Sequence, residues 1–358
     1  MTSDYQLIQG PVCPMPKKHT EKIVMGHGSG GRMSQELIRD IFQSQFNYEP
    51  LMAGNDFGFV NLPEAANLSG HLSISTDMHM VTPLFFPGGD IGKLAICGTV
   101  NDVAMSGGKP LYLTAGFILE EGFPMDTLSR VVASMKAAAE ESGIQIVAGD
   151  TKVAERGSAD KLFINTSGIA WVPDHLQIGG QYAKPGDKVI VSGTLGDHGI
   201  AVLGARGDLG FEADIKSDIA PLNHMIQEIL KVAPNIHVFR DPTRGGLGTT
   251  LNEIAVQSQA SIWINETELP VNPVVQAACE MLGFDPLYIA NEGKLVTICP
   301  VEEADSALEA MQNNQYGKNA VIIGDVRESD PGKVLLRTLI GGTRLIDSLS
   351  GEILPRIC

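Results

Sequence analysis

Residues 90–119 read DIGKLAICGTVNDVAMSGGKPLYLTAGFIL, a helical pattern followed at once by a strand pattern. Apolar residues recur at helical spacing through the first half of this stretch, at Leu94, Cys97, Val100 and Ala104. This spacing predicts a helix from Asp90 to Met105, and the apolar run at Leu111–Leu119 predicts a strand. A helix that leads directly into a strand is typical of a mixed α/β fold.

The same alternation continues on both sides of this stretch. In the first half we predict strands at His71–Thr76, Gln145–Ala148 and Leu162–Ala170, and helices at Met33–Gln45 and about 125–141. In the second half we predict strands at 188–192, 261–264, 294–299, 320–325 and 333–337. The helices of the second half are expected after Gly196 and at 218–232, 246–258, 273–282 and 302–314.

The length of 358 residues exceeds that of a typical single domain, so we expect two. Prolines and glycines interrupt the pattern between Trp171 and Asp187, and we place the boundary there. The predicted division is an N-terminal extension at 1–22, domains at 23–172 and 187–340, and a flexible tail at 341–358.

The composition excludes several classes of function. The chain has 26 basic and 42 acidic residues, and its net charge of −16 argues against non-specific binding to nucleic acid or to an anionic membrane. No apolar run approaches the roughly 18 residues of a transmembrane helix, and residues 1–20 lack the apolar core of a signal peptide. The five cysteines include no C-x-x-C pair, so we expect no zinc site and a cytoplasmic location.

Four aspartates stand at predicted strand or turn ends, namely Asp56, Asp77, Asp102 and Asp150. Carboxylates that converge without Cys or His partners suit Mg²⁺, a hard ion that prefers oxygen ligands. The alternative is that each aspartate caps a turn or a helix, which is common. Four of them in one half of the chain favour the metal.

A glycine-rich loop, Gly28-Ser29-Gly30-Gly31, precedes the first predicted helix. Its backbone N–H groups could approach phosphate oxygens, but it has neither the P-loop Lys nor the G-x-G-x-x-G spacing, and a simple turn is the alternative. The last residue printed, Cys358, follows Pro355 and Arg356. It is either a reactive thiol on a mobile tail or an incidental surface cysteine.

Charged residues at other element ends are candidates for acid–base chemistry. Asn291-Glu292-Gly293-Lys294 and Asp150-Thr151-Lys152 each place a Glu or a Lys where a general base or a charge stabiliser could act. The alternative is surface charge. The eight histidines show no H-x-x-x-H spacing, and we treat them as structural or solvent-facing, with His27 and His198 as the two to check.

At these residues the chain resembles the HypE family of hydrogenase maturation proteins. The matching stretches include HGSGG (27–31), STD (75–77), PLFFPGGDIGKLAICGTVNDVAMSG (83–107), GDTKV (149–153), VSGTLGDHG (191–199), RDPTRGGL (240–247), ANEGKL (290–295) and PRIC (355–358). The final PRIC is specific to this family within its superfamily. The glycine and aspartate motifs are shared with aminoimidazole ribonucleotide synthetase, selenophosphate synthetase and thiamine-monophosphate kinase.

The resemblance implies a two-domain aminoimidazole ribonucleotide synthetase-like α/β fold. The N-terminal domain would bind ATP, and the N-terminal domains of two chains would pair into a dimeric β-barrel. A carbamoyltransferase, HypF, would load a carbamoyl group onto Cys358. The protein would dehydrate this S-carboxamide to a thiocyanate with ATP, and cyanide would pass to iron on a HypC–HypD complex for [NiFe] hydrogenase.

The resemblance also suggests roles for particular residues. The Mg²⁺ ligands would be Asp77, Asp102, Asp150 and Asp241. The ATP-binding residues would be Gly28, Ser29, Gly30, Gly31, Asp56, Lys93 and Asn101. The catalytic residues would be Cys358 as the carrier, Glu292 as the general base and Lys152 as the residue that steadies the oxygen or phosphate.

Two other functions remain open at this stage. One is another enzyme of the superfamily, such as a selenophosphate synthetase, which would need a reactive Cys, selenocysteine or Lys in the glycine loop, where His27-Gly28-Ser29 offers none. The other is a non-enzymatic scaffold that binds a nucleotide and presents its tail. Such a scaffold would not turn over ATP in any loaded state.

Overall fold

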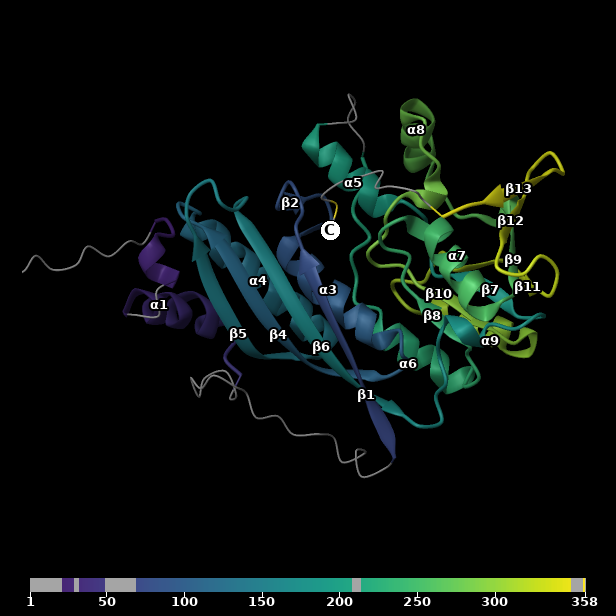
Figure 1. The fold of residues 1–358 in the computed structure, drawn as a ribbon, viewed down its shortest axis with the longest axis horizontal. Helices are drawn as coiled ribbons and strands as arrows, with labels where there is room; N and C mark the ends of the chain where they lie inside the picture. Colours follow the sequence, from purple (N-terminus) through teal and green to yellow (C-terminus); the bar gives the residue numbers. More distant parts are fainter. Residues whose placement is uncertain (1–20, 29–31, 49–68, 208–213, 349–356, 358) are drawn as a thin grey trace, which may run out of the picture.

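The structure, a computed structural model, describes residues 21–28, 32–48, 69–207, 214–348 and Ile357. Figure 1 shows two α/β units side by side, the first built on a four-stranded sheet and the second on a seven-stranded sheet. Three short helical segments precede the first sheet in the described residues 21–28 and 32–48: the 3₁₀ turn η1 (Met25–Gly28), α1 (Arg32–Leu37) and the π-helical η2 (Ile38–Gln43).

The first sheet has the strand order β1-β6-β4-β5. Its strands are β1 (Gly70–His79), β4 (Lys109–Glu120), β5 (Gln145–Ala154) and β6 (Leu162–Pro173). Strands β4 and β5 are parallel because α4 (Met125–Ser142) crosses between them, and the other two pairings are antiparallel. Helices α3 (Ile91–Ala104) and α4 cover one face and form the core with it.

The other face of this sheet is open and partly apolar. Along β6 buried side chains alternate with partly exposed ones, as expected for a sheet covered on one side only. Large apolar side chains on the open face are well exposed, with Ile74 at 69% and Met78 at 76%. The described strands form no closed barrel.

A hairpin of two short strands leads into α3. The strands are β2 (Phe85–Phe86) and β3 (Gly89–Asp90), with two residues each. The carboxylate of Asp90 then caps the helix, because its Oδ1 accepts hydrogen bonds from the backbone N–H groups of Gly92 (2.7 Å) and Lys93 (3.1 Å).

The second sheet has the strand order β13-β12-β9-β11-β7-β10-β8. Its strands are β7 (Lys188–Val191), β8 (Val238–Arg240), β9 (Ser261–Asn265), β10 (Val296–Cys299), β11 (Val321–Arg327), β12 (Val334–Arg337) and β13 (Thr343–Ile346). Three 3₁₀ turns lie in the connections: η4 (Gly180–Tyr182), η5 (Glu266–Glu268) and η6 (Pro286–Tyr288).

Helices cover both faces of the second sheet. Helix α7 (Gly246–Ser258) packs on one face, and α6 (Asn223–Val232) and α9 (Val301–Asn313) pack on the other. Helices α5 (Asp197–Arg206) and α8 (Pro273–Leu282) instead contribute side chains to the core of the first unit. The two units therefore share a buried apolar boundary.

Most of the predicted helices and strands are confirmed within a few residues, but three differ. Strands β1 and β5 run on past Asp77 and Asp150, because they stay paired with β6 and β4 as far as His79 and Ala154, so neither aspartate lies at a strand end. The segment 218–222 is a loop, and α6 begins only at Asn223.

Four strands escaped the sequence prediction because they are short, namely β2, β3, β8 and β13. Strand β8 has three residues, and β13 has four and lies inside the predicted flexible tail, where it pairs with β12. Among the described residues, no helix is long and apolar enough to cross a membrane.

Candidate active site

The two units meet where α3 faces two loops of the second unit, 218–222 and 290–295. Asn101 on α3 is 1% exposed and binds both loops. Its Nδ2 donates to the carbonyl oxygens of Ala220 (3.0 Å) and Glu292 (3.2 Å), and its Oδ1 accepts from the backbone N–H of Leu222 (2.8 Å). The amide of Asn101 is thus engaged with the backbone and holds Glu292 in place. The assignment of Asn101 to ATP stays a prediction.

Glu292 is the most buried of the predicted catalytic residues that the structure describes. Its backbone N–H donates to Oδ1 of Asp218 (3.0 Å), and its side chain is almost fully enclosed. The next residue must be glycine, since a Cβ at Gly293 would lie 1.9 Å from the carbonyl oxygen of Asp218. Backbone contacts on both sides therefore fix the position of Glu292.

The Glu292 carboxylate is buried and incompletely paired. Its Oε1 is buried and has no hydrogen-bond partner within the described part of the chain. Burial raises the pKa of Glu292 well above its ordinary value, and the neighbouring carboxylates of Asp218 and Asp241 raise it further. A buried carboxyl group with a raised pKa and an unused oxygen is typical of a residue that exchanges protons.

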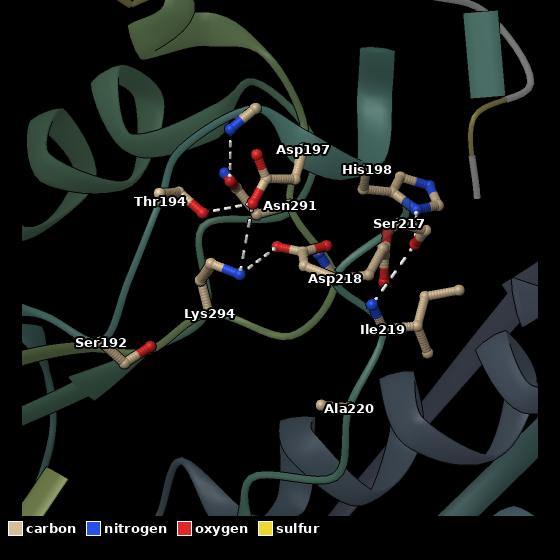
Figure 2. Close-up of polar contacts among 12 residues, drawn as sticks. Ser192, Thr194, Asp197, His198, Ser217, Asp218, Ile219, Ala220, Asn291 and Lys294 are labelled. Carbon is tan, nitrogen blue, oxygen red and sulfur yellow. Dashed lines mark hydrogen bonds and ion pairs between the residues drawn. The ribbon is translucent and has the colours of Figure 1, made fainter. Parts of the chain in front are cut away.

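A lysine partly balances the acids around Glu292. Figure 2 shows Nζ of Lys294 pointing between two aspartates, 3.0 Å from Oδ2 of Asp218 and 3.9 Å from Oδ2 of Asp197. The hydroxyl of Thr194 also donates to Asp197. Burial raises the pKa of Asp197, although Thr194 and Lys294 oppose this shift.

The loop before Glu292 is fixed by one further side chain. Oδ1 of Asn291 accepts from the backbone N–H of Gly196 (2.7 Å), and its Nδ2 donates to the carbonyl oxygens of Pro242 (2.9 Å) and Ile289 (3.2 Å). Asn291 thus ties the loop 290–295 to the start of α5 and to the segment that precedes α7.

Three of the four predicted metal ligands interact electrostatically. Burial raises the pKa of Asp102 to about 7, and Asp241 and Asp77 add to this effect, while a hydrogen bond from Ser75 Oγ (2.8 Å) opposes it. Burial also raises the pKa of Asp241, with a contribution from Asp77. Asp102 and Asp241 line a polar cavity of about 530 Å³ together with Ser75, Thr243 and Arg244.

Asp77 lies beside a buried histidine on β1. Its Oδ2 is 3.7 Å from Nε2 of His79, which is 1% exposed, and its Oδ1 accepts from the backbone N–H of Met78 (2.8 Å). Burial lowers the pKa of His79, although Asp77 opposes this shift.

The fourth predicted ligand, Asp150, is not part of this acidic group. It lies on the open face of the first sheet, where it forms an exposed ion pair with Lys152 (3.6 Å). Within the described residues, no three His, Cys, Asp or Glu side chains form a group that could hold a metal ion. The expected convergence of Asp77, Asp102 and Asp150 is therefore not seen, because Asp150 stands mid-strand with its side chain toward solvent.

Asp150 and Lys152 border a second cavity, of about 430 Å³, which is also lined by Asn165, Arg244 and Ile357. Ile357 is only 2% exposed, although it lies in the predicted tail. The residue that precedes Cys358 is therefore packed inside the molecule, at the edge of a cavity that contains the Lys152 side chain.

The remaining predicted residues are only partly described. Gly28 ends η1, and Lys93 lies in the first turn of α3. Ser29, Gly30, Gly31, Asp56 and Cys358 lie outside the described residues.

Sequence reasoning missed two charged residues of the site. Arg244 lines both cavities, and a signal for it was present, because it stands before the glycine pair that begins α7. Asp218 gave no clear signal, since it was expected in a helix.

Comparison with known protein families supports this architecture. The family model described as AIR synthase related protein, N-terminal domain, matches residues 54–172, and the corresponding C-terminal domain model matches residues 184–337. The two models together cover more than half of the chain.

The chain is also similar to individual proteins along nearly its whole length. It is 52% identical to the carbamoyl dehydratase HypE of Cupriavidus necator, over 94% of this chain and 95% of the relative. A crystal structure of the hydrogenase maturation protein HypE in complex with ATP superimposes with a TM-score of 0.89 at 49% identity, and covers 94% of this chain and 99% of that one.

A third comparison comes from a complex. The crystal structure of a HypE–HypF complex contains a chain that superimposes with a TM-score of 0.76 at 48% identity, over 87% of this chain and 99% of that one. With this identity and coverage, the chain belongs to the HypE family of carbamoyl dehydratases, within the AIR synthase related proteins.

Proposed function

We propose that this protein uses ATP to dehydrate a carbamoyl group on Cys358 to a thiocyanate, which supplies cyanide for the iron of [NiFe] hydrogenase. The observation that carries the proposal is the burial of Ile357 at the edge of the cavity that contains Lys152 and Arg244. This position brings the residue next to Cys358 into the interior. The proposed reaction is that of the carbamoyl dehydratase family to which the chain belongs.

The other thiols that the structure describes are poor carriers. Cys97, Cys279 and Cys299 are free and buried. Burial raises the pKa of all three, to about 11 for Cys279 and about 12 for Cys299, so they stay protonated and unreactive near pH 7. These unpaired thiols also suit the reducing cytoplasm, where we place the reaction.

The proposed chemistry has two steps. The carboxamide oxygen attacks the γ-phosphorus of ATP, ADP leaves, and one N–H proton is lost, which gives an S-bound imidate phosphate. The second N–H proton is then removed, the C–O bond breaks, phosphate leaves, and S–C≡N remains. Phosphorylation is needed because the carboxamide oxygen is otherwise a poor leaving group.

Glu292 suits the removal of these protons. Its Oε1 is buried and has no partner in the described part of the chain, and its raised pKa brings it closer to the range in which a base works well near neutral pH. We assign Lys152 to the developing negative charge on the oxygen or phosphate, because it borders the cavity next to Ile357.

The acidic group fits Mg²⁺ as part of this proposal. Asp77, Asp102 and Asp241 offer hard oxygen ligands, and their mutual repulsion and burial would be relieved by a cation. Mg²⁺ commonly binds through one or two carboxylates together with substrate phosphates and water, so a site without three convergent side chains suits it. When bound, the ion would neutralise phosphate charge. Asp150 is the weakest of the four candidates, because it is exposed and paired with Lys152.

The nucleotide-binding assignments also remain part of the proposal. We assign Gly28 to Gly31 to the phosphates, with Asp56 and Lys93 as further contacts. An ATP complex of a HypE protein at 49% identity supports a nucleotide site in this fold.

The proposed partners are HypF, HypC–HypD and a second copy of the chain. A complex of a HypE relative with HypF supports the first. The open face of the first sheet supports the homodimer, because it exposes Leu72, Ile74 and Met78 on β1 and Ile118 on β4. Pairing of two such faces would give the dimeric barrel that the resemblance implies. The selenophosphate synthetase-like and scaffold alternatives are not favoured, because the chain is 52% identical to a carbamoyl dehydratase.

Mass spectrometry of the C-terminal peptide tests the proposal. After incubation with HypF, carbamoyl phosphate and ATP, Cys358 should gain a carbamoyl group and then lose one water. Cys358→Ala should fold normally and acquire neither adduct. An adduct on Cys97 or Cys299 instead would contradict the assignment.

A further inference from the structure

His198 lies in the first turn of α5 and is fully buried. One ring nitrogen, Nε2, is 2.7 Å from the carbonyl oxygen of Ile357, and the other, Nδ1, is 2.8 Å from Oγ of Ser217. Figure 2 shows His198 beside Ser217 and Ile219. The ring therefore connects the loop 214–222 to the segment that ends in Cys358.

The direction of these hydrogen bonds follows from chemistry. A carbonyl oxygen can only accept, so Nε2 of His198 carries a proton and donates to Ile357. Burial lowers the pKa of His198, so the ring is neutral near pH 7 and Nδ1 accepts from the Ser217 hydroxyl. The Ser217 oxygen in turn accepts from the backbone N–H of Ile219 (3.3 Å).

The partners of His198 are themselves fixed. The backbone N–H of Ser217 donates to the carbonyl oxygen of Pro87 (2.8 Å), and a Cβ at Gly88 would lie 2.5 Å from the Ser217 carbonyl oxygen. The ring of Phe86 stands edge-on to the His198 ring, with 5.7 Å between the centroids. The imidazole therefore has one orientation, with Nε2 toward Ile357.

We propose that His198 is a positioning residue that latches the C-terminal segment in its inward position through the carbonyl group of Ile357. This inference rests on the proposed function, in which Cys358 must be reached by HypF for loading and must return inward for dehydration. Among the described residues, one neutral hydrogen bond and the apolar side chain of Ile357 hold the segment, a combination that is weak enough to release and strong enough to favour the inward state.

The size of the effect follows from the loss of this bond. Removing the donor leaves the buried carbonyl group of Ile357 unpaired, which should shift the equilibrium toward the outward state by about 5- to 150-fold. Loading by HypF should then be as fast as before or faster. Conversion of the loaded thiol should slow, because the inward state is less populated.

Alkylation of Cys358 measures the latch directly. Iodoacetamide labelling is followed in the full chain carrying Cys13→Ser, without ATP or HypF, and cleavage after Glu352 releases the peptide ILPRIC for mass spectrometry. His198→Ala should increase the rate of Cys358 labelling, by up to about 5- to 150-fold. His198→Gln keeps an amide donor near the position of Nε2 and should bring the rate back toward that of the parent chain.

Two internal controls make the result decisive. The buried thiols of Cys97, Cys279 and Cys299 should stay unlabelled if the fold persists, and His175→Ala, which removes an exposed histidine, should label at the parent rate. An unchanged Cys358 rate in a folded His198→Ala variant would overturn the latch. If His198→Ala exposes the buried thiols, Ser217→Ala decides, since loss of the hydroxyl donor should also speed Cys358 labelling, and an unchanged rate would overturn the proposal.

The experiment separates the latch from the proposed function. Labelling needs neither carbamoyl transfer nor ATP, so it reports on the latch even if Cys358 never becomes a thiocyanate. Conversely, thiocyanate formation at the parent rate in His198→Ala, with fast alkylation, would show that the latch exists but does not limit dehydration, which would overturn its role in positioning.

Discussion

The backbone N–H of Glu292 donates to Oδ1 of Asp218 over 3.0 Å, while Oδ2 of the same aspartate lies 3.0 Å from Nζ of Lys294. Asp218 thus fixes the backbone of Glu292, the proposed base, and pairs with Lys294, whose positive charge partly balances the negative charge of the neighbouring carboxylates. Oε1 of Glu292 is buried and has no hydrogen-bond partner among the residues that the structure describes.

Glu292→Gln should separate loading from dehydration. The amide keeps the size of the side chain but cannot accept a proton, so conversion to thiocyanate should fall by about 10²–10⁴-fold. HypF should still load Cys358, and the S-carboxamide should accumulate with ATP present. Time-resolved mass of the C-terminal peptide measures both species. Glu328→Gln, an exposed position after β11, is the matched control, and brisk thiocyanate formation in Glu292→Gln would exclude this residue as the base.

The pH dependence of conversion should also report on Glu292. The base must be deprotonated, and burial raises its pKa well above the ordinary 4.5, so conversion of preloaded protein should increase with pH above that value. Single-turnover rates over a pH series check this. Glu292→Gln should lose the rise, and an unchanged profile in that variant would assign it to another group.

Asp102→Asn should stabilise the empty protein while weakening ATP binding. The folded-state pKa of Asp102 is raised from 3.8 to about 7, so the folded state binds the proton more tightly than the unfolded state does. Its contribution to stability is therefore present at low pH and is lost as the pH rises from about 4 to about 7. At pH 8 the variant should be more stable by about 0.5–2 kcal/mol.

Thermal unfolding at pH 5 and pH 8, with and without Mg²⁺ and ATP, checks the Asp102 prediction. The increase in melting temperature of Asp102→Asn over the parent chain should be larger at pH 8 than at pH 5. Added Mg²⁺-ATP should raise the melting temperature of the parent chain more than that of Asp102→Asn. An equal gain at both pH values would contradict the raised pKa.

Lys152→Met should slow dehydration with little effect on stability. The Lys152–Asp150 pair is exposed, and such pairs contribute only about 0–1 kcal/mol, so the free energy of unfolding should barely change. If Lys152 stabilises developing charge, conversion should fall by about 10²–10³-fold. Denaturant unfolding and thiocyanate yield are measured on the same sample. Lys318→Met, at an exposed site, is the control.

Ile74→Lys should disrupt the proposed homodimer. Ile74 is 69% exposed on the open face of the first sheet, and a buried lysine charge at a dimer interface would be costly. Sedimentation should show a monomer for this variant and a dimer for Val256→Lys, which places the same charge on an exposed apolar position of α7. Dimers in both variants would exclude this face as the interface.

The sequence by itself determined most of the longer helices and strands of this protein and the residue types of its site. Helical spacing in 90–105 and the apolar runs at 111–119 and 162–170 predicted α3, β4 and β6 closely, because each burial pattern is set by local periodicity. Asp77, Asp102 and Glu292 could also be picked out from their neighbours along the chain. Strand β13 in the predicted tail could not be predicted from local sequence, because its four residues are stabilised by pairing with β12.

Only the tertiary structure decided which charged groups meet. Asp77 and Asp102 lie close to Asp241 and Glu292 because α3 of the first unit packs against loops of the second, where Asn101 fixes Glu292. Asp150 has a similar sequence context but stands mid-strand on the opposite face, since side chains alternate along a paired strand. The contact between His198 and Ile357 joins residues 159 positions apart, a separation at which local sequence patterns carry no information on contact.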